Sequence, residues 1–227
     1  MEERIKVTSR QAAQIEEKTR LQARSRLWKS EREIRLTASH FYDIIKVTDR
    51  RDMNAFCESM YEPKDLMNVP AIRHGRTYES AALEKFAQVT GKKILKSGLC
   101  IDPHYPYLGA SPDGFVEGED AVIEVKCSYQ GRHLKIVPEK LKHFPFLENI
   151  GDGRIQLKRS DKYYYQLTGQ MKLSGKNHGY FVVFTHEDLF YEEINLDESF
   201  FTTKMLPKLQ DFYKNQYCPY IASKLKE

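Results

Sequence analysis

The sequence predicts an α/β domain in which a central mixed β-sheet is flanked by helices. Two kinds of hydrophobic spacing alternate along its 227 residues. Residues 71–90 have helical spacing, with Tyr78 and Phe86 on one face. From residue 93 the spacing becomes that of strands, and helical spacing returns at 161–174. Helices that alternate with strands in this way pack as layers against a sheet.

The predicted helices have residues at their ends that favour helix boundaries. Ser39 precedes a short helix, because a serine hydroxyl accepts hydrogen bonds from the free amides at a helix start. Gly91 follows the 71–90 helix at the position where glycine commonly ends helices. Residues 63–70 are expected to form a loop. The predicted helices span residues 9–30, 39–45, 52–61, 71–90, 161–174 and 198–217.

The strand-like runs predict a meander followed by a hairpin. The β-branched run 121–127 is the strongest of them. The excursion at 134–160 contains two prolines and two glycines, and we expect it to be partly helical. No repeat or flexible linker divides the chain, so we expect a single domain over residues 1–227, with the helical segment 1–35 integral to it. The predicted strands are 93–101, 107–110, 114–117, 121–127, 180–185 and 189–194.

The composition is that of an ordinary globular protein, with 41% hydrophobic and 30% charged residues. No apolar run has the length needed to cross a bilayer, and the charged start Met1–Arg4 lacks the apolar core of a secretory signal. The four cysteines form no CxxC pair, which argues against a zinc site or a disulfide framework. We therefore expect an intracellular protein without membrane contact.

Charge is unevenly placed along the chain. Residues 1–35 contain ten Lys or Arg and six Glu, which equals the net charge of +4 of the whole chain. A basic leading segment suits a polyanionic partner such as nucleic acid. A solvated helix rich in Arg and Glu is an equally good interpretation of these residues taken alone.

Acidic residues and a lysine follow one another around residues 113–126. Side chains alternate between the two faces of a strand, so Glu124 and Lys126 point one way and Val125 the other. Asp113 alone is an ordinary turn residue in a Pro-Asp-Gly sequence, and the pair Glu124 and Lys126 alone fits a solvated strand face. Taken together, two carboxylates that converge attract a hard divalent cation such as Mg²⁺. A lysine beside them suits metal-assisted phosphodiester hydrolysis.

These residues resemble the PD-(D/E)xK nuclease signature. Asp113 and the Glu124-Val125-Lys126 sequence match its core, and Glu79 matches its helix-borne acid. Other matches occur in order along the chain at Trp28, Arg32, Leu36–Ser39, Tyr163–Gln166 and Gln170-Met171, and the set resembles the phage lambda exonuclease family, also called the YqaJ-like viral recombinase family. The resemblance implies a PD-(D/E)xK restriction-endonuclease-like core.

The resemblance also implies roles for individual residues. Asp113, Glu124 and the carbonyl of Val125 would bind Mg²⁺, or Mn²⁺ in its place, and Glu79 would bind a second ion or hold its water shell. Lys126 would orient the attacking water or stabilise charge on the phosphate; the sequence leaves both roles open, including that of a base. Gln166 would hydrogen-bond to Lys126 or to that water, with Gln170 in support on the same helix face. The family's second glutamine position holds Thr168, which puts a double-glutamine arrangement in doubt.

Two family positions imply contact with a DNA end. Arg32 and Ser39 match residues that bind the 5′-phosphate, with Arg35 and His40 as nearby alternatives; a guanidinium suits a phosphate because it binds two oxygens at once. Ile72 matches an apolar wedge that splits the duplex end, although simple core burial explains it equally well. An Arg on a helix face and an ordinary helix cap are the plain interpretations of Arg32 and Ser39.

The expected activity is that of a Mg²⁺-dependent 5′→3′ exonuclease that digests one strand of linear duplex DNA and leaves a 3′ single strand for recombination. The resemblance implies a ring-shaped homotrimer and a single-strand annealing protein as partner. A structure-specific endonuclease or resolvase with the same metal core is the alternative, and a catalytically inactive DNA-binding module is a weaker one. The compartment would be the nucleus for a viral or eukaryotic source and the cytoplasm for a phage or bacterial one.

Overall fold

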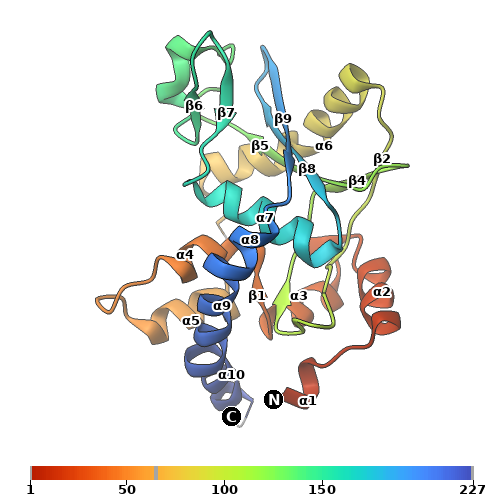
Figure 1. Cartoon of the computed structure of the whole chain (residues 1–227), viewed down its shortest axis with the longest axis vertical. Coiled ribbons are helices and arrows are strands. Elements are labelled where there is room, and N and C mark those ends of the chain that lie inside the picture. The colour runs from red at the N-terminus through yellow and green to blue at the C-terminus, as the bar shows by residue number, and fades with distance from the viewer. Residues whose placement is uncertain (1, 64–65, 226–227) are drawn as a thin grey trace.

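A five-stranded mixed sheet forms the centre of the molecule (Figure 1). The computed structural model describes residues 2–63 and 66–225. The strand order is β2-β4-β5-β8-β9. Strands β5 and β8 pair in parallel over seven residues, and the other pairs are antiparallel, which confirms the predicted mixed sheet. The strands are β2 (Ile94–Leu95), β4 (Gly114–Val116), β5 (Ala121–Cys127), β8 (His178–Phe184) and β9 (Leu189–Asn195).

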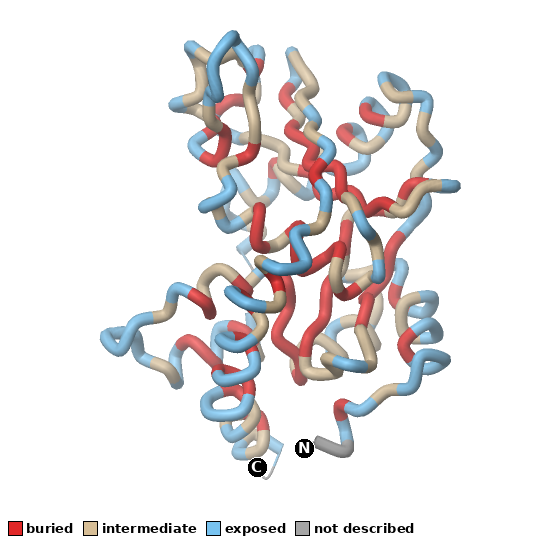
Figure 2. Tube along the Cα trace, viewed as in Figure 1, coloured by how far each residue is buried: buried red, intermediate tan, exposed pale blue. Residues whose placement is uncertain are grey.

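Two helices cover opposite faces of this sheet (Figure 1). Helix α6 (Pro70–Thr90) packs Ala82 and Phe86 against alternate side chains of β5 that include Ile123. Helix α7 (Lys162–Ser174) packs against the other face, which includes Val122. Figure 2 shows buried residues concentrated where the sheet meets these helices. Full burial of each large apolar side chain contributes about 1.5–3 kcal/mol, so the two faces of β5 hold both layers in place.

Three predicted helices are confirmed together with their boundary residues. Gly91 ends α6 with a φ of 70°, the left-handed conformation that glycine adopts without strain. Asp161 caps α7 by accepting a hydrogen bond from the Tyr163 amide at 3.0 Å. Asp52 caps α5 (Met53–Tyr61) in the same way. The loop expected at 63–70 lies partly outside the described residues, and Pro70 is the first residue of α6.

The prediction of a single helix over residues 9–30 is wrong in one respect, because the structure has two helices there. Helix α2 (Ser9–Lys18) is separated by a 3-10 turn from α3 (Arg26–Glu33). At the break the Thr19 hydroxyl accepts a hydrogen bond from the Leu99 amide at 2.8 Å. A contact between segments 80 residues apart therefore overrides the helical propensity of the local sequence.

The expected cap at Ser39 is also corrected. Ser39 lies within a 3-10 turn, Ala38–His40, that leads into α4 (Phe41–Ile45), and its hydroxyl caps neither element. Instead its Oγ lies 3.2 Å from the Thr37 Oγ1. The serine hydroxyl is thus directed toward a neighbouring side chain rather than toward a helix amide.

The predicted meander is only partly correct. Strands β2, β4 and β5 form it, but β3 (Leu108–Gly109) leaves it to pair in parallel with β1 (Leu36–Thr37) in a separate sheet. Within the run 93–101 only Ile94–Leu95 is a strand, although Cys100 forms an isolated antiparallel bridge with Ala110 of the predicted strand 107–110. The amides of Gly98 and Leu99 are hydrogen-bonded to side chains of the α2 region, which removes them from sheet pairing.

The remaining segments frame the sheet. The excursion at 134–160 forms a 3-10 helix, Pro138–His143, and a hairpin of β6 (Leu147–Asn149) and β7 (Ile155–Leu157). The hairpin predicted near the end of the chain is confirmed as β8 and β9. Helical structure then runs without a break from Glu198 to Lys224, beyond the predicted end at Tyr217. Its segments are α8 (Glu198–Phe200), α9 (Leu206–Phe212) and α10 (Cys218–Lys224), joined by two π-helical turns.

Two further findings bear on the composition. All four cysteines are free thiols, in agreement with their scattered spacing. Among the described residues, no helix combines the length and apolarity that a membrane crossing requires.

Candidate active site

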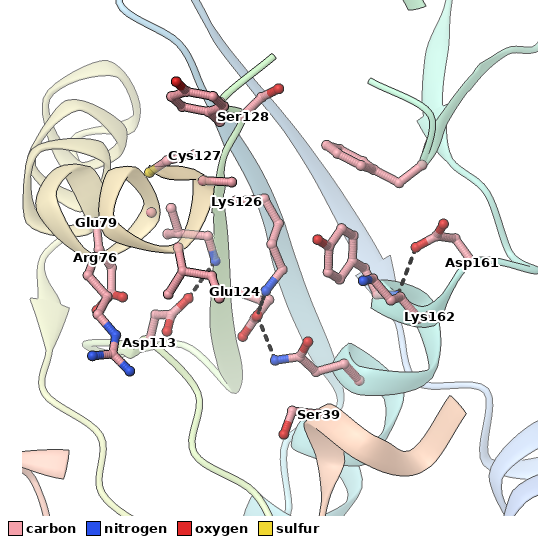
Figure 3. Close-up of a pocket in the computed structure, with 18 of the residues that line it drawn as sticks. Ser39, Arg76, Glu79, Asp113, Glu124, Lys126, Cys127, Ser128, Asp161 and Lys162 are labelled. Carbon is pink, nitrogen blue, oxygen red and sulfur yellow. Dashed lines mark hydrogen bonds and ion pairs between the residues drawn. The ribbon is translucent and has the colours of Figure 1, made fainter. Parts of the chain in front are cut away.

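A cleft of about 910 Å³ opens beside β5, between α6 and α7. Most of the predicted site residues line it, and the exceptions are Arg35, His40 and Gln170. Figure 3 shows Glu79 reaching in from α6, Asp113 from a turn, and Glu124 and Lys126 from β5. Residues far apart in sequence therefore meet in one cavity. The predicted site residues in its wall are Arg32, Ser39, Ile72, Glu79, Asp113, Glu124, Val125, Lys126 and Gln166.

Glu124 is the most enclosed of the acids and is held by three donors. Its side chain is 2% exposed. Gln166 Nε2 donates to Oε1 at 2.7 Å, and Gln170 Nε2 donates to Oε2 at 2.6 Å. Lys126 forms an ion pair with the same carboxylate. This network fixes the orientation of Glu124 and joins β5 to α7.

Asp113 is joined to β5 through its backbone and its side chain. Its amide donates to the Ile123 carbonyl at 2.9 Å, and its Oδ2 accepts from the Val125 amide at 2.7 Å. Burial and the negative charges of Glu124 and Glu79 raise the pKa of Asp113 well above its usual value. The turn thus places a carboxyl group beside the two other acids although their charges repel.

Glu79 and Lys126 complete this charge arrangement. Burial and the charge of Glu124 raise the pKa of Glu79, and Lys126 partly offsets that rise. Burial lowers the pKa of Lys126, but the attraction of Glu124 and Asp113 outweighs it, so the net shift is upward. The Lys126 ammonium also lies 4.5 Å from the centroid of the Tyr163 ring. Lys126 thus stands among three acidic groups, and Arg76 adds a second positive charge beside Glu79.

The residues fit a hard divalent cation by charge and by donor chemistry. Besides burial, the charge of Glu124 raises the pKa of both Glu79 and Asp113, so a cation among these acids would offset the repulsion. Oxygen donors are those that Mg²⁺ prefers. As the side chains stand, no three His, Cys, Asp or Glu groups in the described part of the chain are spaced as metal ligands. Glu124 is turned toward Lys126 and the two glutamines, so metal binding would require it to share or release these partners.

Arg32 lines the cleft, and its guanidinium stacks on an aromatic ring. Its guanidinium lies 4.1 Å from the centroid of the Trp28 ring. Trp28 Nε1 donates to Ser111 Oγ at 2.9 Å, which fixes the ring beneath Arg32. Burial lowers the pKa of Arg32 to about 10, which leaves it charged at neutral pH. Among residues 2–63 and 66–225 no carboxylate forms an ion pair with it, so the charge is available to a ligand.

The structure corrects the suggestion that Arg35 could bind a phosphate. Its side chain is buried, and its nitrogens donate to the carbonyls of Pro106, Glu31 and Ile5 at 2.9, 3.0 and 3.1 Å. It also forms an ion pair with the Glu31 carboxylate. With these donors engaged, Arg35 holds the N-terminal helices to the chain around residue 106.

His40 is also a poor phosphate ligand. Its Nδ1 lies 3.1 Å from Thr37 Oγ1. Burial and the neighbouring positive charge of Arg32 lower the pKa of His40 to about 4, so the ring is neutral at neutral pH. Arg32 and Ser39 are thus the better placed of the proposed phosphate ligands.

Ile72 lies in the cleft wall and is half-buried. It belongs to none of the hydrophobic clusters formed by the described residues. This position disfavours simple core packing. The wedge role stays a prediction.

Gln170 supplies the second amide that the sequence left in doubt. Thr168 is buried and donates to the Tyr164 carbonyl at 2.8 Å, so it does not reach the acids. Gln170, one helical turn after Gln166, takes that place through its bond to Glu124. The spacing of the two glutamines had already placed both on one face of this helix. Cleft residues that the sequence analysis did not propose include Arg76, Tyr129, His143 and Lys162.

Comparisons with known proteins identify the family and the fold of the chain. The model of the YqaJ-like viral recombinase domain matches residues 27–177. No curated protein sequence matches the chain. Among solved structures, an alkaline exonuclease from Laribacter hongkongensis is 23% identical, with a TM-score of 0.66 over 88% of this chain and 96% of that one. A phage-related exonuclease from Haemophilus somnus 129PT is 14% identical, with a TM-score of 0.57 over 87% and 99%.

A third similar structure is SOX in complex with DNA, at 12% identity and a TM-score of 0.60 over 93% of this chain and 72% of that one. At these identities the solved structures show a shared fold. The family match spans more than half of the chain and includes the acids, the lysine and Arg32. The chain therefore belongs to the YqaJ-like viral recombinase domain family.

Proposed function

We propose that this protein is a Mg²⁺-dependent 5′→3′ exonuclease that digests one strand of linear double-stranded DNA and leaves 3′ single-stranded tails for recombination. One observation carries the proposal. In the same cleft Glu79, Asp113 and Glu124 lie around a lysine, and Arg32 forms no ion pair with a carboxylate of the described residues. The first group suits hydrolysis of a phosphodiester, and the second suits a terminal phosphate.

The acids would hold the metal and the lysine would act beside it. Asp113, Glu124, the Val125 carbonyl and Glu79 are the donors that would bind one or two Mg²⁺ ions, with Mn²⁺ as a substitute. Such an ion, when bound, lowers the pKa of a water and stabilises charge on the phosphate. Lys126, fixed by Glu124, would orient the attacking water or stabilise the phosphate. Gln166 and Gln170 would act as positioning residues, because the amide of each donates a hydrogen bond to Glu124.

The direction of digestion would follow from how the DNA end is held. The Arg32 guanidinium is planar and can bind two oxygens of a 5′-phosphate, and the Ser39 hydroxyl lines the same cleft. Ile72 lies at the start of α6 in the same wall, where an apolar side chain could separate the terminal base pair. Unstacking one step costs only a few kcal/mol, so binding energy at the phosphate could compensate for it.

The proposed partners are nucleic acid and other copies of the chain. Solved SOX structures contain DNA in one case and RNA in another, which supports nucleic acid as the class of ligand. The family resemblance supports a homotrimeric ring that encloses the DNA and a single-strand annealing protein that receives the product strand. Light scattering on the purified chain would give its mass, and a value near three times 26.6 kDa would support the ring.

Electrophoresis of labelled DNA tests the proposal. Linear duplex with 5′-phosphate ends should be degraded with Mg²⁺ and left intact with EDTA, and closed circular duplex should persist. Lys126→Ala should abolish degradation, and Lys126→Arg would separate the two roles of the lysine, because arginine keeps the charge but cannot act as a base. Equal cleavage of closed circles would contradict the exonuclease proposal and favour a structure-specific endonuclease or resolvase.

A further inference from the structure

The loop that follows the catalytic strand carries an exposed aromatic side chain on the rim of the cleft. After Cys127 the chain turns, and Ser128 Oγ accepts a hydrogen bond from the Gly131 amide at 3.1 Å. A Cβ atom at Gly131 would clash with the buried ring of Phe144, so the loop is packed closely there. This turn places Tyr129 in the cleft wall with 36% of its surface exposed.

Tyr129 is held in position by two neighbours. The Arg132 guanidinium lies 4.4 Å from the centroid of its ring, and Arg132 Nη1 donates to the Tyr129 carbonyl at 2.7 Å. The His74 ring meets the tyrosine edge-on, with centroids 5.7 Å apart. A ring fixed in this way loses little conformational entropy when a ligand binds, which favours binding.

Histidine and arginine side chains surround the tyrosine on the side away from the cleft. His74 is 8% exposed, and its Nε2 has no hydrogen-bond partner among the residues that the structure describes. Burial and the neighbouring His186, Arg132 and His133 lower the pKa of His74. No carboxylate in the described part of the chain forms an ion pair with Arg132. A nucleotide could bind both groups. Its base would stack on the exposed ring of Tyr129, and its phosphate would attract the Arg132 guanidinium.

The order of residues along the cleft indicates which part of the cut DNA strand would reach Tyr129 and Arg132. Figure 3 shows Ser39 at one end, Ser128 at the other, and Glu124 with Lys126 between them. A strand with its 5′-phosphate near Ser39 would pass the acids before it reaches the loop after Ser128. We propose that Tyr129 and Arg132 form a nucleotide subsite that stacks a base on the 3′ side of the bond to be cut. This inference rests on the proposed function.

Photocrosslinking tests the subsite without cleavage. Linear duplexes with a 5′-phosphate would carry one 5-iodouracil at the first, second, third or fourth nucleotide, and would be irradiated with the full chain in EDTA. The wild-type protein should crosslink at residue 129, identified by mass spectrometry, with the second or third nucleotide and not with the first. Tyr129→Phe should keep the crosslink because a phenyl ring still stacks.

Removal of the ring should remove the contact. Tyr129→Ala should lose the crosslink and bind the same duplex about tenfold more weakly, within the range expected for one stacked base. Tyr191→Ala is the matched control, because Tyr191 is 42% exposed but lies outside the cleft wall. It should crosslink and bind as the wild type does. Arg132→Gln, which keeps the tyrosine, should weaken binding and reduce its dependence on salt, and it stands in if Tyr129→Ala does not fold.

The outcomes separate the subsite from the proposed function. If the wild type degrades linear duplex but neither crosslinks at residue 129 nor binds DNA more tightly than Tyr129→Ala, the subsite is wrong and the nuclease proposal stands. If the wild type neither binds nor degrades linear duplex with Mg²⁺, the proposed function fails and the subsite fails with it. A crosslink at residue 129 from the first nucleotide alone would contradict the assigned position.

Discussion

Charged residues of the cleft differ from those that hold the N-terminal helices in place, here called the N-terminal scaffold, in whether they have partners of opposite charge. In the scaffold, Arg35 donates to three carbonyls and pairs with Glu31. In the cleft, Asp113 lies against two other acids, and Arg32 has no carboxylate partner among the described residues. Arg32 lies in the last turn of α3 and Arg35 two residues after its end, so closeness in sequence does not give them the same environment.

The contrast shows how the molecule divides stability from function. A buried charge with all its hydrogen bonds made strengthens the connection between segments, and its removal leaves its partners unsatisfied. Charges of one sign held together, or a partly buried cation without an anionic partner, destabilise the folded state unless a ligand supplies the opposite charge. We therefore expect substitutions in the two regions to affect different properties.

Asp113→Asn should show the largest effect. Nuclease activity should fall on the order of a thousandfold or more, because loss of one carboxylate ligand removes several kcal/mol of metal-assisted stabilisation. The metal-free variant should nevertheless melt at a higher temperature than the wild type, because the amide ends the repulsion and can still accept from the Val125 amide. Thermal melting in EDTA would check this, with the exposed Glu84→Gln as control. A melting temperature of Asp113→Asn below that of the wild type would contradict the claim that repulsion among the acids destabilises the metal-free protein.

Arg35→Met should have the opposite pattern. We expect a loss of about 3–5 kcal/mol in the free energy of unfolding, the usual effect of removing one partner from a buried ion pair. Urea denaturation would measure it. Arg32→Met, which removes the same group three residues earlier, should change stability far less. Similar losses for the two variants would show that Arg32 also has a structural role.

Arg32→Ala should act on the choice of DNA end. A charge-assisted hydrogen bond contributes about 1.5–3 kcal/mol, so the preference for 5′-phosphorylated over 5′-hydroxyl duplex should fall about tenfold to a hundredfold. Digestion rates on the two substrates under the same conditions would give the ratio. An unchanged ratio would remove Arg32 from the phosphate site and leave the acids unaffected.

His40 should produce the smallest effect, as a dependence of stability on pH. Its pKa of about 4 lies below its usual value, so the unfolded chain binds the proton first as pH falls. Stability from neutral His40 is therefore present above about pH 6.5 and is lost as pH falls toward 4, with a slope no steeper than about 1.4 kcal/mol per pH unit. His40→Gln should flatten that slope in urea titrations between pH 7 and 4. Parallel curves would refute the assignment.

The site was predictable to the extent that it follows from alternation along one strand and one helix. The spacing of Glu124 and Lys126 put both on one face of β5, and the spacing of Gln166 and Gln170 put both on one face of α7. The 21-residue helix α6 was recognisable from its periodic apolar side chains and its terminal Gly91. These features depend on backbone geometry that neighbouring residues set by themselves.

Contacts between distant segments decided the features that the sequence analysis missed. The break after α2 depends on Thr19 binding the Leu99 amide, and β3 left the meander to pair with β1. The stacked pair of Tyr129 and Arg132 depends on a loop packed against Phe144. A local sequence pattern does not predict such partners, because residues far apart in the sequence come into contact only when the chain is folded.

By itself, the sequence determined the α/β class, the alternating faces of β5 and the family, since periodicity and ordered motifs are properties of the chain. Only the tertiary structure decided which arginine is free and which is engaged. The physical reason is that the environment of a charge is set by the groups that surround it in space. For Arg35 these are carbonyls from residues 5, 31 and 106, and for Arg32 they are a tryptophan ring and an open cleft.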